Sequence, residues 1–159
     1  MISDVAADWR PTGMFGDIPV SEPLERALTA MGYEEPSPIQ TLVAPHLLEG
    51  RDLVGQAQTG TGKTSAFGIP IVEAIKGEPF RPGSPLAIVL CPTRELAAQV
   101  TGELTKLGAY AGVKPVAVYG GQSMNVQLDA LQAGAQVVVA TPGRLMDHME
   151  RRTIDLQQV

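Results

Sequence analysis

Eight consecutive residues constrain the fold of this chain more than any other stretch. They are Ala57, Gln58, Thr59, Gly60, Thr61, Gly62, Lys63 and Thr64, which follow the pattern of a phosphate-binding loop. In such a loop, backbone N–H groups surround a phosphate, and the glycines permit the close approach and the unusual backbone angles. A helix that begins at Lys63 would direct its positive end at the same anion. We therefore predict that the Lys63 side chain reaches the terminal phosphates and that the Thr64 hydroxyl holds Mg²⁺.

The neighbouring segments supply the context that this loop requires. Residues 52–57 predict a short strand and residues 65–69 predict a helix, so strand, loop and helix follow one another. An ordinary turn rich in Gly and Thr is the alternative, and this context disfavours it. The loop therefore predicts a nucleotide site at the end of a strand.

Composition limits the remaining possibilities. The chain has 159 residues, about one domain, and 44% of them are hydrophobic, which is ordinary for a globular protein. It has no apolar run of the roughly 20 residues that span a bilayer, and its acidic N-terminus is unlike a signal peptide. A single cysteine, Cys91, excludes an internal disulfide and suits the cytoplasm. The net charge of −5 and the pI near 5.0 argue against nucleic-acid binding through overall basicity.

Strand-like and helix-like segments alternate along the chain. Residues 1–14 show no periodicity and predict a flexible N-terminal lead-in, so one domain is expected over 15–159. The apolar run at 86–91 predicts a strand covered on both faces. Further strands are expected over 113–119 and 136–140, and helices over 21–31, 39–48 (bent or interrupted at Pro45), 95–107 with Leu96 inward, 125–132 and 141–152. This order predicts an α/β fold with a mostly parallel sheet flanked by helices.

Polar motifs follow several of these strands. Besides the phosphate loop they are 92–95 (Pro-Thr-Arg-Glu), 120–121 (Gly-Gly) and 141–144 (Thr-Pro-Gly-Arg). Parallel sheets bind ligands beyond the carboxyl ends of their strands, so we expect these segments to share one edge. Glu95, at the start of a predicted helix, is expected to offset the helix dipole rather than to act as an acid. His46 and His148 lack partners at metal-ligand spacing and are expected at the surface or in the core.

At these motifs the chain resembles the DEAD-box RNA helicase family, over its first RecA-like domain. Residues 32–40 correspond to the nucleotide-sensing Q motif, and the phosphate loop corresponds to motif I. Residues 92–99 match motif Ia and residues 141–144 match motif Ib, with the glycine doublet between them. The resemblance covers roughly residues 15–148 and implies a P-loop NTPase domain.

The resemblance implies roles for two residues outside the loop. Gln40 would read adenine, because an amide can donate to N7 and accept from the exocyclic amine, a pattern that guanine reverses. Phe15 lies 17 positions before Gly32, where the family places an aromatic that stacks on the base. The alternatives are a solvated glutamine and a core aromatic. ATP or ADP with Mg²⁺ is thus the expected cofactor.

The resemblance also implies contacts to the RNA backbone that are independent of sequence. The implied RNA-binding residues are Pro92, Thr93, Arg94, Gly121, Thr141 and Arg144. A few helix ends and two arginines form such a track without a basic pI. The alternatives are that Arg94 pairs with a carboxylate and that Thr141 only caps a helix.

The sequence departs from the family in one respect that affects the chemistry. The family's Asp-Glu-Ala-Asp motif, its motif III and its second RecA-like domain are absent from these 159 residues. In the family these parts complete the metal site and supply arginines to the transferring phosphate. We therefore expect a C-terminally incomplete domain that binds ligands without turnover and is destabilised, self-associates or is completed by a further segment. A non-hydrolysing nucleotide- or RNA-binding module, or a P-loop motor that acts on DNA, are the alternative functions.

Overall fold

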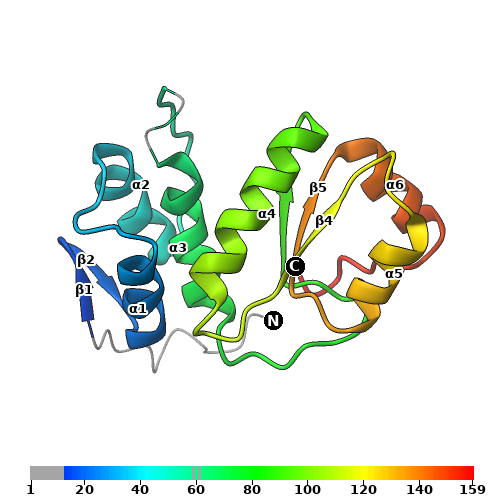
Figure 1. Cartoon of the computed structure of the whole chain (residues 1–159), viewed down its shortest axis with the longest axis horizontal. Helices are drawn as coiled ribbons and strands as arrows, with labels where there is room; N and C mark the ends of the chain where they lie inside the picture. Colours follow the sequence, from blue (N-terminus) through cyan, green and yellow to red (C-terminus); the bar gives the residue numbers. More distant parts are fainter. Residues whose placement is uncertain (1–12, 59, 61) are drawn as a thin grey trace.

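The computed structural model describes residues 13–58, 60 and 62–159 (Figure 1). The described elements are β1 (Gly13–Phe15), β2 (Ile18–Val20), α1 (Glu22–Ala30), α2 (Pro38–Leu48), α3 (Lys63–Ile75), β3 (Ala87–Leu90), α4 (Arg94–Gly108), β4 (Pro115–Val118), α5 (Met124–Gln132), β5 (Val137–Ala140) and α6 (Pro142–Glu150).

The main sheet is parallel and has the strand order β3-β5-β4. Val139 in the central strand pairs with Val89 on one side and with Ala117 on the other. The chain returns from β3 to β4 through α4, and from β4 to β5 through α5 (Figure 1). The predicted α/β architecture is therefore present, and all three strands end at the same edge.

The two faces of β5 pack against different helices, because successive strand residues point in opposite directions. Val137 and Val139 belong to the core that contains Ala97 and Leu104 of α4. Val138 and Ala140 belong to a second core, with Leu131 of α5, Leu145 of α6 and Ile154. All four residues of β5 are buried, as its unbroken apolar sequence predicts. The sheet thus lies between α4 on one side and α5 with α6 on the other (Figure 1).

A close helix contact joins the N-terminal part to the sheet. Gly68 of α3 lies against Leu104 and Leu107 of α4, where a Cβ would come within 2.7 Å of the Leu107 side chain. Helix α2 packs in turn on α3 (Figure 1). The phosphate-loop helix is therefore held against α4, the helix that begins at the Pro-Thr-Arg-Glu motif.

The predicted strand at residues 52–57 is not formed. Residues 51–58 have no regular secondary structure, and Val54 is fully exposed. Leu53 and Gly55 instead lie against Val43 and Ile39 of α2. A strand requires a neighbour for its backbone groups, and no described strand pairs with this segment.

Two predictions about buried faces are also wrong. Strand β3 was expected to be covered on both faces, but it is an edge strand whose Leu90 is 59% exposed. On α4, Leu96 is 39% exposed, and Ala97 is the buried residue in that turn. Both leucines are apolar, but no element among the described residues packs over them.

The N-terminal part differs from the sequence expectation as well. Residues 13 and 14, assigned to a flexible lead-in, form a hairpin with Ile18–Val20, while residues 1–12 lie outside the described part. Helix α1 begins after Ser21, whose side chain makes no capping bond. The Ser21 hydroxyl instead donates to Oε1 of buried Glu73 at 2.6 Å. Pro45 lies inside α2, which continues to Leu48 without interruption.

The C-terminal end of α4 provides a stability test. A Cβ at Gly108 would lie 2.5 Å from the Val113 carbonyl oxygen, which is backbone and cannot rotate away. We expect Gly108→Ala to lower the free energy of unfolding by about 2 kcal/mol, measured by urea denaturation. Gly102→Ala on the same helix is the control, because no atom lies within 4 Å of its Cβ position and alanine favours helix by about 1 kcal/mol. Equal urea midpoints for Gly108→Ala and Gly102→Ala would contradict the close packing of Gly108 against Val113.

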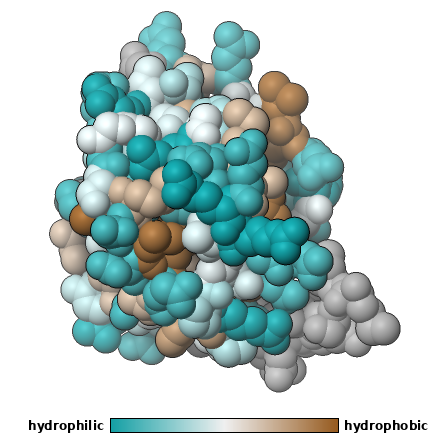
Figure 2. Space-filling view, turned by 90° about the vertical axis from the view of Figure 1, so that its right-hand side faces the viewer, coloured by the Kyte–Doolittle hydropathy of each residue, from teal (hydrophilic) through white to brown (hydrophobic). Residues whose placement is uncertain are grey.

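The surface over α5 and α6 is mostly hydrophilic (Figure 2). Its exposed apolar side chains include Val126 of α5 and Met146 and Met149 of α6. Leu145 of α6, by contrast, is buried. No helix in the described part of the chain is long and apolar enough to cross a bilayer.

Candidate nucleotide and nucleic-acid interface

Three helices begin at the same edge of the molecule. In Figure 1, α3, α4 and α6 all start at the upper edge, where the sheet strands end. Helix α3 follows the phosphate loop directly, and α4 and α6 follow β3 and β5. Each helix begins with backbone N–H groups that lack helical partners and with a partial positive charge. This edge is therefore suited to anions, as the motif positions predict.

The phosphate loop has the backbone that its glycines permit. Gly60 and Gly62 have φ values of 79° and 81°, and Gly62 directly precedes α3, so no side chain caps that helix. The Lys63 ammonium donates to the Ala57 carbonyl oxygen at 2.7 Å, and Lys63 is exposed. Thr64 is half-buried in the first helical turn. Thr59 and Thr61 lie outside the described residues.

Gln40 links the Q-motif segment to this loop. Its side chain is only 2% exposed, so it is not a solvated residue. Nε2 donates to the Gly62 carbonyl at 3.1 Å, and Oε1 accepts from the Ser37 backbone N–H at 3.0 Å. These bonds use one amide N–H and one oxygen lone pair, so the amide retains capacity for one donated and one accepted bond. Gln40 lines a pocket of about 240 Å³ together with Tyr33, Ser37 and Gly60.

This pocket of about 240 Å³ also contains Glu35 and Gly62 in its walls. Phe15 is not among them. Its ring is only 4% exposed and packs in the core at 6.4 Å from the Tyr33 ring, measured between centroids. Phe15 thus lies in the core, as the alternative to its stacking on a base predicts. The aromatic residue that lines the pocket is Tyr33, which the motif assignment did not single out.

Tyr33 is held in place by α4 as well. Its hydroxyl donates to Oε1 of Glu103 at 3.0 Å, and the same oxygen accepts from the buried Ser65 hydroxyl at 2.7 Å. Burial raises the pKa of the Tyr33 hydroxyl, and the adjacent Glu103 raises it further. One carboxylate thus joins the pocket wall, the first turns of α3 and the middle of α4.

The remaining motifs meet in a groove of about 720 Å³ at the ends of the sheet strands. Five of the six predicted RNA-binding residues line it, and Gly121 adjoins it through Gly120. The lining residues are Pro92, Thr93, Arg94, Glu95, Gly120, Thr141, Gly143, Arg144 and Asp147. Segments separated by up to 55 positions in the sequence therefore form one surface, as expected from the strand order.

Arg94 and Thr93 mark the start of α4 in this groove. A Cβ at Gly121 would lie 2.6 Å from Nη1 of Arg94, so a larger residue there would displace the guanidinium from its present position. No carboxylate of the described residues lies within ion-pair distance of Arg94, in contrast to the alternative weighed from the sequence. The Thr93 hydroxyl accepts from the Leu96 N–H at 3.2 Å and therefore caps the helix. Thr141 occupies the corresponding position before α6 and makes no side-chain capping bond.

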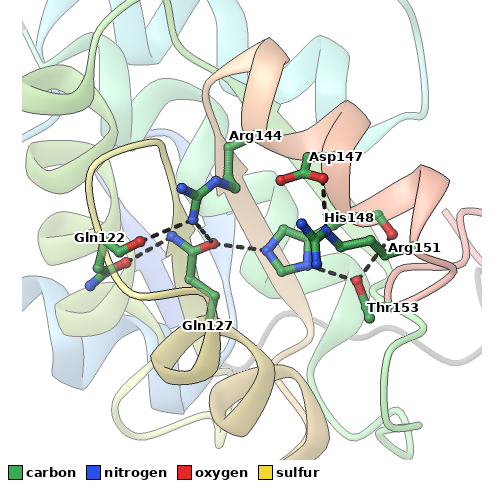
Figure 3. Close-up of polar contacts among 7 residues, drawn as sticks. All are labelled: Gln122, Gln127, Arg144, Asp147, His148, Arg151 and Thr153. Carbon is green, nitrogen blue, oxygen red and sulfur yellow. Dashed lines mark hydrogen bonds and ion pairs between the residues drawn. The ribbon is translucent and has the colours of Figure 1, made fainter.

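Arg144 is part of a polar network that the motifs did not reveal (Figure 3). Its Nη1 donates to the Gln122 carbonyl at 3.0 Å and to Oε1 of Gln127 at 3.1 Å. Gln127 is buried on the same face of α5 as Leu131, four positions later. A polar residue on the apolar face of a predicted helix is the one sequence signal that pointed to it. His148 of α6 lies on the other side of Gln127.

The buried His148 gives stability a pH dependence. Burial lowers the pKa of its imidazole, and the charge of Arg144 lowers it further. The unfolded chain therefore binds the proton more tightly, and the contribution of His148 to stability is complete above about pH 6.5 and is lost as the pH falls below it. We expect the urea midpoint to fall between pH 7.5 and pH 5.5, and to fall less in His148→Asn. The same fall in both proteins would show that His148 is not the group responsible.

The acidic groups of the groove do not form a metal site. Asp147 accepts from Nε of Arg151 at 2.8 Å, and this hydrogen bond holds the pKa of its carboxyl below the usual range. Among the described residues there is no group of three His, Cys, Asp or Glu side chains that could hold a metal ion. Glu95 lies in the first turn of α4, where its charge offsets the helix dipole.

Comparison with known proteins places these motifs in a family. The model of the DEAD/DEAH box helicase family matches residues 37–159. The ATP-dependent RNA helicase DeaD of Klebsiella pneumoniae is 51% identical over 146 residues, which are 91% of this chain and 22% of that protein. The crystal structure of a DEAD box protein from Methanococcus jannaschii has a TM-score of 0.81 at 38% identity, over 90% of this chain and 38% of the other.

A second solved structure carries a nucleotide. The RNA helicase Prp28 from Chaetomium thermophilum, bound to ADP, has a TM-score of 0.80 at 42% identity, over 87% of this chain and 34% of the other. These likenesses confirm the predicted RecA-like α/β fold. The family model covers most of the chain, including the phosphate loop and both motifs of the groove. This chain belongs to the DEAD/DEAH box helicase family.

Proposed function

We propose that this chain is the ATP- and RNA-binding part of an ATP-dependent RNA helicase that unwinds short RNA duplexes or remodels RNA–protein complexes. The observation that carries the proposal is the meeting of Pro92–Glu95, Gly120 and Thr141–Arg144 in one groove, on the same edge as the phosphate loop. The DeaD relative is named an ATP-dependent RNA helicase, and the chain spans 22% of its length. Unwinding is therefore proposed for the whole protein.

On the nucleotide side, the pocket beside Gly60 and Gly62 would hold adenine. Gln40 borders that pocket with a donor and an acceptor still available, which suits the N7 and the exocyclic amine of adenine. The Tyr33 ring is the aromatic surface next to it. Gly62 adjoins the Gln40 amide, since a Cβ there would lie 2.4 Å from Nε2. The proposed adenine site is thus adjacent to the proposed phosphate site.

On the phosphate side, the loop residues from Ala57 to Thr64 would surround the phosphates. Lys63 would exchange its bond to the Ala57 carbonyl for a phosphate oxygen, which is a stronger, charge-assisted partner. The Thr64 hydroxyl is the side-chain oxygen in the first turn of α3 that would hold Mg²⁺. Bound Mg²⁺ would neutralise phosphate charge.

On the RNA side, Arg94 and Arg144 would bind phosphates with the N-termini of α4 and α6. These contacts carry no base information, so the binding would be independent of sequence. Arg94 and Arg144 are offset by Glu95 and Asp147 in the groove, and Asp147 is already paired with Arg151. Two placed guanidinium groups thus reconcile RNA binding with the net charge of −5.

Hydrolysis would need groups that the 159 residues do not contain. None of the described strands is followed by an acidic pair, and the Asp-Glu-Ala-Asp sequence is absent. We propose that the chain by itself binds nucleotide and RNA without turnover, and that a second RecA-like domain is the partner needed for hydrolysis. The open edge at β3 is the feature through which self-association would occur.

Calorimetric titration with ADP and GDP tests the nucleotide assignment. We expect ADP to bind about 5- to 150-fold more tightly than GDP, since one base-edge pair is worth about 1–3 kcal/mol. Gln40→Ala should reduce that preference, whereas Gln99→Ala, an exposed glutamine on α4, should leave it unchanged. Equal affinities for ADP and GDP in the unchanged chain would contradict the adenine site.

A further inference from the structure

Gln127 uses every hydrogen-bonding position of its side-chain amide. Nε2 donates to the Tyr119 carbonyl at 2.9 Å and to Oε1 of Gln122 at 3.0 Å. Oε1 accepts from Nη1 of Arg144 at 3.1 Å and contacts Nε2 of His148 at 2.8 Å (Figure 3). The side chain is 1% exposed, so water does not compete for these bonds. The orientation of the amide is therefore fixed, with its oxygen toward α6.

His148 stabilises this orientation of the Gln127 amide through a hydrogen bond to its oxygen. The Gln127 oxygen carries no hydrogen, so Nε2 of His148 is the donor in their contact. In a neutral imidazole Nδ1 is then an acceptor, and the Thr153 hydroxyl lies 2.8 Å from it. His148 is fully buried, and its proton is thus directed at Gln127. The network continues from Thr153 through His148 and Gln127 to Arg144 (Figure 3).

The opposite edge of the Arg144 guanidinium has no hydrogen-bond partner among the described residues. Both N–H groups of Nη1 are used, by the Gln122 carbonyl and by Gln127. The N–H groups of Nε and Nη2 remain, and they form the planar pair that binds two oxygens of one phosphate. Arg144 lines the groove together with Arg94 and Thr141. A free arginine side chain would lose considerable rotamer freedom on binding, and this one has already lost it.

We propose that Gln127 is the positioning residue for the RNA-binding arginine Arg144, holding the guanidinium with its Nε–Nη2 edge toward the RNA backbone. Gln127 is buried and does not line the groove, so it acts through Arg144 alone. The inference rests on the proposed RNA binding in this groove. It predicts that a residue away from the RNA sets RNA affinity.

The test is a double-mutant cycle on binding of a labelled single-stranded RNA 10-mer, followed by fluorescence anisotropy. We expect Gln127→Leu to weaken binding about 3- to 10-fold, as expected for one long side chain that must be ordered on binding. Gln127→Glu keeps the acceptor for Arg144 and should recover part of the loss. Gln132→Leu, an exposed position on the same helix, is the control and should have no effect. In the Arg144→Ala background, Gln127→Leu should change RNA affinity by less than twofold.

A second readout needs no RNA. In the unchanged chain, rotation of the Arg144 guanidinium should be slow in NMR exchange spectra, and Gln127→Leu should make it fast. A loss of affinity in Gln127→Leu that persists in the Arg144→Ala background would overturn the inference, because the residue would then act through general structure. Rotation that is equally fast in both proteins would overturn it as well. If Arg144→Ala itself has no effect on RNA binding, the proposed function of the groove fails, while the rotation rates still decide whether Gln127 positions Arg144.

Discussion

Replacement of Lys63 by alanine is expected to weaken ADP binding by about 10- to 100-fold. The ammonium group is exposed and donates to the Ala57 carbonyl, a neutral partner that a phosphate oxygen would replace. Hydrogen bonds to charged groups contribute about 1.5–3 kcal/mol, which corresponds to the expected range. Stability should change little, because Lys63 is exposed.

Calorimetric titration of both proteins with ADP measures this effect. Lys114→Ala removes the same charge at an exposed position after α4 and serves as the matched control. Unchanged ADP affinity in Lys63→Ala, or an equal loss in Lys114→Ala, would show that the loop does not bind phosphate through this lysine.

Removal of both groove arginines is expected to lower RNA affinity by about 100-fold or more. Each phosphate contact by a guanidinium is a charge-assisted bond, and Arg94 and Arg144 come from different helices. The loss should be similar for RNA of any sequence, because backbone contacts carry no base information. The dependence of affinity on salt should also become weaker, by roughly 0.7 in the logarithmic slope for each lost contact to single-stranded RNA.

Anisotropy titrations of Arg94→Ala, Arg144→Ala and the double variant at several salt concentrations measure both effects. Arg81→Ala, an exposed arginine in the loop before β3, is the control with the same charge change. A double variant that retains the affinity of the unchanged chain, or a loss limited to one RNA sequence, would contradict an RNA-backbone site in this groove.

The elements that could be predicted from the sequence are those whose signals are local. The start of α3 at Lys63 follows from the loop pattern, and β5 follows from an unbroken run of β-branched residues. Cys91 is buried, as expected for a small apolar residue at the end of a strand, and burial raises the pKa of its thiol. The sequence also predicted that Arg94 and Arg144 share one groove, because parallel strands place their carboxyl ends at one edge of the sheet.

The sequence predictions were wrong or incomplete where contacts with another part of the fold determine whether a segment is paired or buried. Residues 52–57 have the composition of a strand, but no described strand pairs with them, and Leu90 is exposed because β3 is an edge. Phe15 could be placed only by its distance from the Q-motif segment, and that distance does not show that the ring packs on Tyr33 in the core. Gln127 has no motif, so its role becomes visible only when α5 and α6 are seen together.

Backbone amide NMR titrations, with ADP and with single-stranded RNA added separately, test the central claim most directly. The claim is that one chain holds a nucleotide site and a distinct RNA track on the same edge. We predict that ADP shifts the amide signals of residues 33–40 and 57–66, and that RNA shifts those of residues 92–95, 120–122 and 141–147. RNA-induced shifts confined to the phosphate loop or to the opposite end of the sheet would contradict the account.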